Sequence, residues 1–138
     1  MNEFNLHIIE ADSDFFNGKC VSLVIPTTEG MYGIQAGHEN LVAAITIGVI
    51  KYTLPDGTRC HAAVSNGMVK VENNDVMILV ESAEDPDEID EERAKREEEM
   101  AREILSGRTD RLNYRSAKGI MARAINRLKI KKRYGKYN

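Results

Sequence analysis

Apolar and polar residues alternate along much of the first eighty positions of the chain. Phe4, Leu6 and Ile8 are the first example, and further short apolar runs such as Leu41 to Ile45 and Val76 to Val80 follow. A repeat of two residues places every second side chain on one face of a β-strand. Because these runs are many and short, with no helical spacing between them, residues 1–82 are predicted to form an antiparallel sandwich or barrel.

Turn-forming residues separate these runs. Asn17-Gly18 predicts a hairpin turn that is followed by a strand over residues 19–25. Pro55-Asp56-Gly57 predicts another turn, because proline presets the first turn angle and glycine accepts the positive one. Asn66-Gly67 and Asn73-Asn74 predict two more. Neighbouring strands are therefore expected to be joined by short loops.

The pattern changes between Glu81 and Ala94, where the β-region gives way to a helical one. Asp85-Pro86-Asp87-Glu88 indicates a helix start. Asp85 can accept the free amides of the first turn, Pro86 fits the first helical position, and Glu88 completes a capping box. The carboxylates also lie favourably at the positive end of the helix dipole. We expect the first helix to begin at this motif.

The remaining residues follow the three- and four-residue spacing of two helices. The apolar stripe of the first is Ile89, Ala94, Met100, Ala101, Ile104 and Leu105, and that of the second is Ala117, Ile120, Met121, Ala124 and Leu128. Ser106-Gly107 predicts a left-handed cap that ends the first helix, and Thr109 or Asp110 can cap the second. Both stripes are thin, so the sequence predicts an antiparallel hairpin of marginal stability.

Charge is distributed unevenly, although the net charge is only −3. Residues 81–103 carry 12 acidic and 4 basic side chains, whereas residues 104–138 carry 11 basic and 1 acidic. The two segments can pair with each other, or the basic segment can meet an acidic partner. The charge pattern alone leaves both alternatives open.

Composition and cysteine usage exclude several classes of protein. No apolar run approaches the roughly 20 residues that cross a bilayer. The first residues lack the basic and apolar regions of a secretory signal. Cys20 and Cys60 lie in apolar strand patterns and are predicted to be buried, inert thiols. A reducing cytoplasmic setting follows.

No catalytic or metal-binding constellation emerges from the sequence. His7, His38 and His61 lie far apart, and none has a partner at metal-ligand spacing, so each is interpreted as a strand or turn residue. The serines lack the context of a catalytic nucleophile. The acidic run from Glu97 to Glu99 is interpreted as a solvated helix face rather than as part of a cation site. We therefore expect no catalytic residue and no metal site.

Arginines of the two predicted helices form a candidate ligand site. Arg93 follows Asp90 by three positions, so both lie on one side of the first helix and can pair. Arg123 and Arg127 are four positions apart on the second helix. If the hairpin closes, one carboxylate and several guanidinium groups converge, and such a set suits a triphosphate. The alternative interpretation is a salt-bridge cluster that steadies the interface between the helices.

Four segments share the pattern of one family. Two lie in the β-region, GKCVSLVIPTTEGMYGIQAGHENLVAAITIGVI at 18–50 and SNGMVKVENNDVMILVESAE at 65–84. Two lie in the helical region, IDEERA at 89–94, which fits the pattern I/L-D-x-x-R-A, and RAINRL at 123–128. Ala36 stands where many members have proline. Together these segments resemble the epsilon subunit of bacterial F-type (F1Fo) ATP synthases, and the resemblance covers essentially the whole chain.

The resemblance implies an all-β sandwich of about ten antiparallel strands over residues 1–84, followed by an α-helical hairpin over residues 85–138. In that family the sandwich binds the gamma subunit and the c-ring, and the hairpin reaches the alpha and beta subunits. The subunit is a non-catalytic part of the rotor that couples ion translocation to ATP synthesis, and its movable helices inhibit ATP hydrolysis. Such a protein is peripheral to the cell membrane on the cytoplasmic side and has no nucleic acid partner.

The resemblance also implies a regulatory ATP rather than a required cofactor. Carried over position by position, the ATP-binding residues are Glu84, Ile89, Asp90, Arg93, Ala94, Arg123 and Arg127. Met100 departs from the binding members, which have a basic residue there, although Arg96 and Arg102 are close. The basic residues expected to meet acidic residues of the catalytic subunits are Arg123, Arg127, Lys131, Lys132 and Arg133.

A rival interpretation is a free-standing β-sandwich adaptor whose basic helical tail binds nucleic acid or an anionic membrane. The 11 basic residues after Ile104 permit it. Interleaved aromatic residues are few, however, and no groove-reading motif is present. Copurification with a gamma subunit would distinguish the two interpretations.

Overall fold

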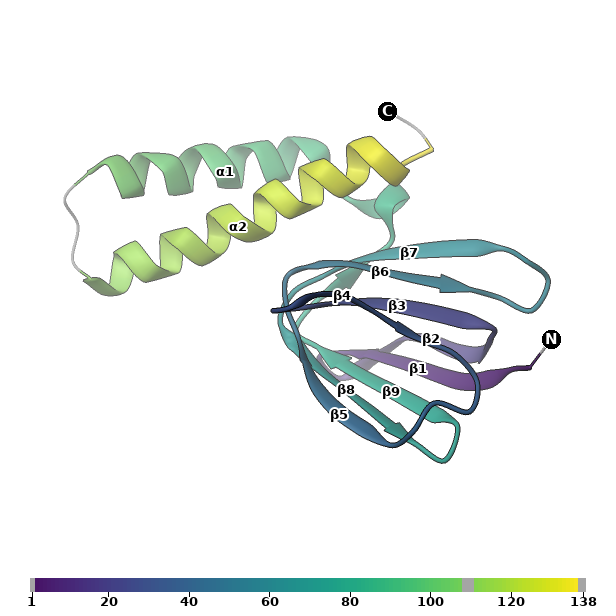
Figure 1. Cartoon of the computed structure of the whole chain (residues 1–138). Helices are drawn as coiled ribbons and strands as arrows, with labels where there is room; N and C mark the ends of the chain where they lie inside the picture. The colour runs from purple at the N-terminus through teal and green to yellow at the C-terminus, as the bar shows by residue number, and fades with distance from the viewer. Residues whose placement is uncertain (1, 108–110, 137–138) are drawn as a thin grey trace. The chain divides into compact units, whose positions relative to one another are not determined.

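The computed structural model describes residues 2–107 and 111–136 of the chain. These residues form two compact units, Met1–Glu84 and Asp85–Asn138. The first unit contains strands and the second contains helices (Figure 1).

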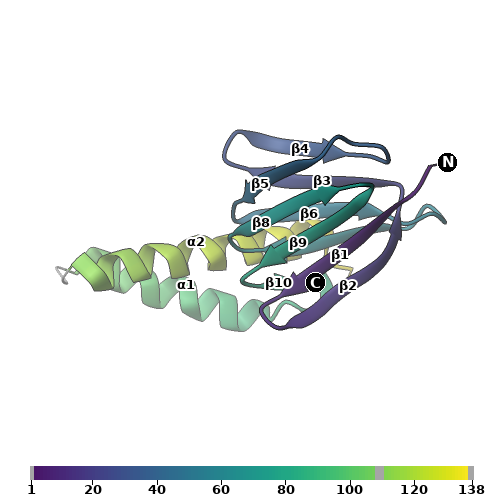
Figure 2. The ribbon, with the colours of Figure 1, turned by 90° about the horizontal axis from the view of Figure 1, so that it is seen from below.

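The first unit is a sandwich of two five-stranded sheets (Figures 1 and 2). Sheet A has the strand order β2-β1-β9-β8-β5, and sheet B has the order β10-β7-β6-β3-β4. The strands are β1 (Phe4–Glu10), β2 (Ser13–Cys20), β3 (Ser22–Thr27), β4 (Gly30–Ile34), β5 (Leu41–Ile45), β6 (Gly48–Thr53), β7 (Arg59–Val64), β8 (Gly67–Glu72), β9 (Asp75–Val80) and β10 (Ala83–Glu84). The predicted ten-stranded sandwich is confirmed.

One strand pair departs from the predicted antiparallel arrangement. β1 pairs with β9 in parallel, so that Leu6 lies opposite Val76 and Ile8 lies opposite Ile78. The other pairings of the described strands are antiparallel, which makes sheet A mixed and sheet B antiparallel. Alternation of apolar residues indicates which face of a strand is buried but not the direction of its neighbour. The sequence pattern therefore did not reveal this pair.

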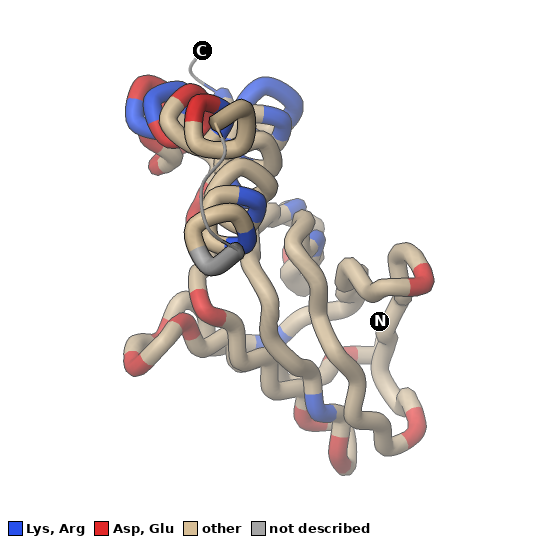
Figure 3. Tube along the Cα trace, turned by 90° about the vertical axis from the view of Figure 1, so that its left-hand side faces the viewer, with Lys and Arg blue, Asp and Glu red and all other residues tan. Residues whose placement is uncertain are grey.

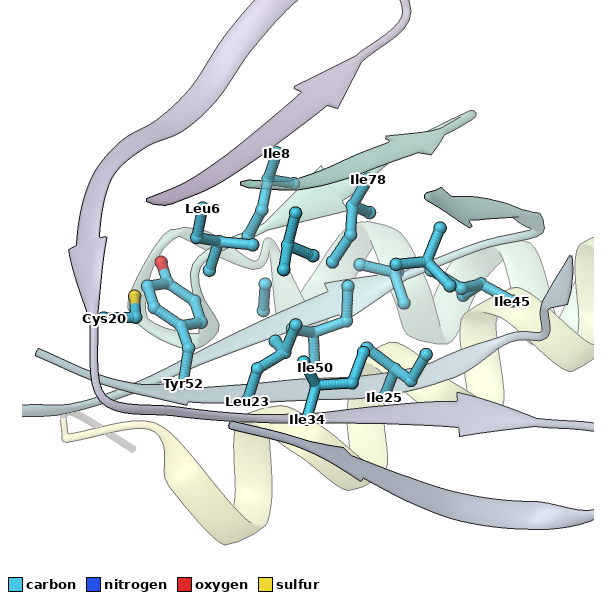
Figure 4. Close-up of a cluster of buried hydrophobic side chains, with 14 of the residues drawn as sticks. Leu6, Ile8, Cys20, Leu23, Ile25, Ile34, Ile45, Ile50, Tyr52 and Ile78 are labelled. Atoms are coloured by element: carbon cyan, nitrogen blue, oxygen red, sulfur yellow. The ribbon is translucent and has the colours of Figure 1, made fainter. Parts of the chain in front are cut away.

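Aliphatic side chains from both sheets fill the space between them. Figure 4 shows Leu6, Ile8 and Ile78 of sheet A facing Ile50 and Tyr52 of sheet B. The largest fully buried side chains include Phe4, Leu6, Ile8, Leu23, Ile25, Ile34, Ile50 and Ile78. Since burial of one such side chain stabilises a fold by about 1.5–3 kcal/mol, this core is a major source of stability for the first unit.

The predicted hairpin turn at Asn17-Gly18 is wrong. Both residues lie inside β2, where Gly18 pairs with Leu6 and a side chain at Gly18 would meet the Phe16 ring at 3.0 Å. The chain turns instead between β1 and β2 at Ala11, which has a φ of 50°. The turn predicted at Asn73-Asn74 is confirmed, because both residues have the positive φ that a tight hairpin requires.

The two cysteines differ in burial. Cys20 is fully buried in the core and Cys60 is half-buried, and both are free thiols. Burial, followed by the effect of Cys60, raises the pKa of Cys20 to about 11. The Cys20 thiol therefore stays protonated and unreactive, as the sequence predicted, since the thiolate is the nucleophile. The prediction of full burial is wrong for Cys60.

The second unit is an antiparallel pair of helices preceded by a short turn of 3-10 helix (Figures 1 and 2). Its elements are η1 (Pro86–Glu88), α1 (Glu91–Ser106) and α2 (Arg111–Tyr134). The two α-helices pack against each other along their length. The predicted helical hairpin is confirmed. No helix among the described residues is long and apolar enough to cross a membrane.

The start and end of α1 differ from the predicted ones. Asp85 caps η1, where its Oδ1 accepts a hydrogen bond from the backbone N–H of Asp87 at 2.9 Å. Ile89 is extended, which interrupts the helix, and α1 begins after a second cap at Asp90. Gly107 is also extended (φ −85°), so the predicted left-handed cap is wrong. The predicted caps Thr109 and Asp110 lie outside the described residues.

Candidate functional site

Alanines occupy the buried face of both helices. Ala94 and Ala101 on α1, and Ala117 and Ala124 on α2, are almost completely inaccessible to solvent. The two alanines of each helix are seven positions apart, a spacing that keeps them on one face. Such small side chains permit close packing but bury little apolar area. Polar contacts between the helices are therefore expected to contribute a larger share of the stability of the hairpin than they would in a helix pair packed through leucine or isoleucine.

Asp90 and Arg93 do not pair through their side chains as predicted. The Oδ1 of Asp90 accepts a hydrogen bond from the backbone N–H of Arg93 at 3.0 Å. The Nε of Arg93 donates instead to Oε1 of Glu97 at 2.9 Å. The prediction is wrong because a carboxylate at the N-cap lies beside the free amides of the first turn, whereas the arginine pairs one helical turn further on.

Glu97 connects the two helices. Its second oxygen, Oε2, accepts from Nη1 of Arg127 on α2 at 3.4 Å. The side chains of Glu97 and Arg127 are 26% and 24% exposed, whereas that of Arg93 is 71% exposed. One carboxylate therefore bridges two guanidinium groups, one from each helix. The interpretation of Glu97 as part of a solvated face is wrong. Its four-residue spacing from Arg93 indicates the pair within α1, whereas the contact with Arg127 depends on how the two helices pack.

The other residues predicted to bind ATP are placed differently. Ile89 and Ala94 are buried. Arg123 precedes Arg127 by one helical turn, and its guanidinium lies beside Gly119, where an added Cβ would be 3.2 Å from Nη1. Glu84 ends β10 in the first unit. Within the hairpin, the structure therefore brings Arg93 and Arg127 together at Glu97.

A second polar contact closes the C-terminal end of α2. Lys131 is only 9% exposed, and its Nζ donates to the carbonyl oxygen of Asp87 at 3.1 Å. The backbone N–H of Lys136 donates to Oδ1 of Asp87 at 2.6 Å. Lys131 is thus engaged within the hairpin, in contrast to its exposed neighbours Lys132 and Arg133. The sequence does not distinguish Lys131 from these two neighbours, because its burial depends on the contact between α2 and η1.

Lys131 also borders a hollow of about 450 Å³ on the hairpin. Its lining residues are Glu91, Lys95, Leu128, Lys131 and Lys132. The Nζ of Lys95 lies 3.4 Å from Oε1 of Glu91, one helical turn away. The hollow is thus predominantly basic, and it does not include the residues predicted to bind ATP.

Acidic and basic residues are interleaved along α1, whereas the charged residues of α2 are all basic (Figure 3). Arg102 pairs with Glu98 at 2.7 Å and Lys95 pairs with Glu91, in both cases within α1. Pairs between residues four positions apart within one helix stabilise it by only about 0.3–0.5 kcal/mol each. Across the helices, Arg127 pairs with Glu97, while Lys132 and Arg133 remain exposed. The first alternative left open by the charge pattern, pairing between the two segments, is thus realised at Arg127 and Glu97, and a contact of the basic segment with an acidic partner stays a prediction.

Histidines in the first unit take part in hydrogen bonds with nearby strand and turn residues. The Nδ1–H of His38 donates to the carbonyl oxygen of Glu39 at 2.7 Å, because a carbonyl can only accept. Its Nε2 accepts from the Tyr32 hydroxyl at 2.8 Å. Within residues 2–107 and 111–136, no group of three or more His, Cys, Asp or Glu side chains is placed to hold a metal ion.

Sheet A carries an exposed apolar face that sequence reasoning missed. Val42 on β5, Met68 on β8, and Met77 and Leu79 on β9 are each between 39% and 64% exposed. Met68 lies opposite Leu79, and Lys70 lies between Val42 and Met77 in the register, so these side chains share one side of the sheet. Although Lys70 separates Val42 from Met77, a group of exposed apolar side chains on one side of a sheet is typical of a protein-binding surface. We call these four residues the outer face of sheet A.

These observations define a class of protein, a two-sheet β-sandwich joined to a helical hairpin. Residues 3–86 match the family model described as "ATP synthase, Delta/Epsilon chain, beta-sandwich domain". Residues 87–132 match the model described as "ATP synthase, Delta/Epsilon chain, long alpha-helix domain". The chain therefore belongs to the ATP synthase delta/epsilon chain family.

Individual relatives agree with this assignment. The ATP synthase epsilon chain of Staphylococcus aureus strain JH9 is 38% identical over 131 residues, which cover 94% of this chain and 97% of that one. The epsilon chain of strain Newman has the same identity and coverage. In sequence, therefore, the similarity extends over both units.

Solved structures share the fold. A chain of the Euglena gracilis mitochondrial ATP synthase, in an OSCP/F1/c-ring structure, superposes with a TM-score of 0.77 at 24% identity, over 87% of this chain and 76% of that one. A chain of the Tetrahymena thermophila mitochondrial ATP synthase, in a central stalk/c-ring structure, has a TM-score of 0.61 at 14% identity, over 92% and 95% of the two chains.

Proposed function

We propose that this chain is the epsilon subunit of the central stalk of a bacterial F-type ATP synthase. The observation that carries the proposal is that the two family models match in order, one for each structural unit. As a non-catalytic rotor component, the subunit helps to couple ion translocation through the membrane ring to ATP synthesis. It is bound at the cytoplasmic side of the membrane through its partners in the complex.

The sandwich serves as the platform that binds the gamma subunit and the c-ring. Its core of fully buried aliphatic residues gives the rigidity that such a platform needs. The outer face of sheet A supports a protein contact, because methionine and leucine side chains are exposed together there. We assign this face to the gamma subunit.

Copurification with the gamma subunit tests this assignment. Replacing Met77 and Leu79 by glutamate introduces two charges into the outer face of sheet A, and we expect most of the gamma binding to be lost. Met31→Glu is the matched control, because Met31 is 52% exposed but lies on β4 of sheet B. Unchanged gamma binding by the double variant would rule out this face, and salt-dependent binding to nucleic acid without gamma binding would favour a free-standing adaptor.

The hairpin regulates ATP hydrolysis by shifting between two placements, one of which reaches the alpha and beta subunits. The exposed basic residues Lys132 and Arg133 near the end of α2 support a contact with acidic partner residues. We expect Lys132→Gln combined with Arg133→Gln to relieve inhibition of ATP hydrolysis in the reconstituted complex. Inhibition as strong as that of the unaltered subunit would contradict this contact.

A regulatory ATP binds to the hairpin in this proposal. Two guanidinium groups, from Arg93 and Arg127, lie within hydrogen-bond distance of one acidic group, which is the donor chemistry that a phosphate chain requires. Asp90, Ala94, Ile89, Arg123 and Glu84 complete the proposed set. Calorimetric titration of MgATP into the isolated protein tests it, with Arg127→Ala expected to abolish binding. Binding that is unchanged in Arg127→Ala would place the nucleotide elsewhere.

A further inference from the structure

Glu97 accepts hydrogen bonds from two of the arginine side chains that are proposed to bind the nucleotide. Its Oε1 accepts from Nε of Arg93 at 2.9 Å, and its Oε2 accepts from Nη1 of Arg127 at 3.4 Å. A carboxylate binds a guanidinium through the same charge-assisted hydrogen bonds that a phosphate uses. Both oxygens of Glu97 are engaged, each by an arginine of a different helix.

We propose that Glu97 competes with phosphate groups for Arg93 and Arg127 and thereby sets the affinity of the hairpin for nucleotide. This inference rests on the proposed binding of ATP to the hairpin. A phosphate that approaches either arginine must replace Glu97 as its partner or accept a like charge close by. In both cases the phosphate binds with a less favourable free energy, because the negative charge of Glu97 already partly neutralises the guanidinium groups.

The position of Glu97 has a second consequence, for closure of the hairpin. The face between the helices contains alanines, so a polar bridge contributes a larger share of their association. The Arg127–Glu97 pair joins α1 to α2 through side chains that are about three-quarters buried. Glu97 thus holds the helices together through the contacts that a bound phosphate would otherwise make. Bound nucleotide is therefore expected to shift this hairpin toward its closed form by less than it would shift a hairpin that has no carboxylate at position 97.

The test compares Glu97→Gln with a matched control on the same helix. Glutamine keeps the size of the side chain but removes its charge. Glu98→Gln removes the same charge one residue away, where the carboxylate is similarly exposed (24%) and pairs within α1 with Arg102 at 2.7 Å. MgATP and inorganic tripolyphosphate are titrated separately into each full-length protein by calorimetry.

We expect Glu97→Gln to bind both probes about tenfold more tightly than the unaltered chain, because two charge-assisted hydrogen bonds are no longer contested. Glu98→Gln is expected to bind like the unaltered chain. An equal gain in the two variants would indicate only a change in overall charge and would overturn the proposal. Far-UV circular dichroism checks that the helices persist. If Glu97→Gln loses helix, Glu97→Asp, which keeps the charge but shortens its reach, is expected to show a smaller gain.

The remaining outcomes separate this inference from the proposed function. If the unaltered chain binds ATP and neither Glu97 variant binds it more tightly, the competition is overturned while nucleotide binding stands. If no variant binds either probe, both the competition and the nucleotide site are overturned, whereas copurification with the gamma subunit still decides the subunit identity. Binding by Glu97→Gln alone would support both.

Discussion

The sandwich and the hairpin are stabilised in different ways. The sandwich buries isoleucine, leucine, valine and phenylalanine between two sheets, and each contributes a large apolar area. The hairpin buries four alanines and one large aliphatic side chain, Ile130, on its helices, and Glu97, Asp87 and Lys131 add polar contacts. The difference indicates that apolar packing stabilises the first unit more strongly than the second, in which hydrogen bonds and ion pairs contribute a larger share.

This contrast bears on the proposed function. Ordering the backbone of a residue costs about 1–2 kcal/mol, and a unit that buries little apolar area offsets this cost only narrowly. Such a unit opens locally at a lower free energy than the core of the protein. A well-packed platform joined to a hairpin that we expect to be less stable is therefore suited to a subunit in which one part stays bound while the other changes its contacts.

The largest expected effect is in the core of the sandwich. Ile78 is fully buried on β9, and Ile78→Ala leaves a cavity that should lower the free energy of unfolding by about 3–4 kcal/mol. Met77→Ala at the neighbouring exposed position is the control and should cost less than about 0.5 kcal/mol. Urea unfolding monitored by β-sheet circular dichroism measures both. Similar losses of unfolding free energy in the two variants would mean that the core does not dominate the stability of the sandwich.

The next effect concerns the interface between the helices. Ala124 is fully buried on α2, and Ala124→Leu overpacks the interface at a cost of about 1–3 kcal/mol. Ala122 is exposed two residues earlier, so Ala122→Leu is the control. Amide hydrogen exchange should show faster exchange in α1 and α2 of Ala124→Leu but unchanged exchange in the strands. Faster exchange in both units would show that they do not unfold separately, and the two units would then not differ in local stability.

The sequence predicted the sandwich because strands and turns are specified by neighbouring residues. Leu6 and Ile8 show the alternation of a strand, and Asn73-Asn74 are typical turn residues. It did not predict the parallel β1–β9 pair, since the direction of a neighbouring strand depends on contacts far apart in the chain. Asn17-Gly18 was misinterpreted for a related reason. Gly18 is needed beside the Phe16 ring inside a strand, and the turn is made by Ala11.

The candidate site was predicted only in part. Helical spacing and the family pattern identified Arg93 and Arg127 as candidate site residues. The structure brings both of them to Glu97. The bridging role of Glu97 depends on the register of α2 against α1, and helical spacing does not specify that register. Lys131 was missed for the same reason, because its burial depends on the approach of η1 to the end of α2.

A smaller effect is expected at the end of α2. Lys131→Met keeps an apolar stem of similar length but removes the hydrogen bond to the carbonyl oxygen of Asp87, which should cost about 1 kcal/mol. Exposed Lys132 provides the control, Lys132→Met. Hydrogen exchange should accelerate in the last turn of α2 and in η1 for Lys131→Met only. If the last turn exchanges alike in the two variants, polar contacts do not hold the hairpin closed at this end.

The smallest expected effect is on the thermal stability of the sandwich, and it concerns the exposed carboxylate of Asp56. The backbone N–H of Thr58 donates to Oδ1 of Asp56 at 2.9 Å, and this hydrogen bond lowers the pKa of Asp56 below its usual value. A lowered pKa in the folded state adds stability at pH values above the unfolded pKa of about 3.9, and this stability is lost as the pH falls through the folded pKa. Asp56→Asn keeps an oxygen that can accept from Thr58 but cannot ionise.

The unaltered chain should therefore melt at a slightly higher temperature than Asp56→Asn at pH 7, and the difference should disappear as the pH falls below about 4. Thermal melts of both proteins between pH 7 and pH 2 measure it. A difference that stays constant over this range would mean that the carboxylate contributes nothing through its ionisation. A difference as large as that caused by Ile78→Ala would contradict the conclusion that packing, rather than charge, determines the stability of the sandwich.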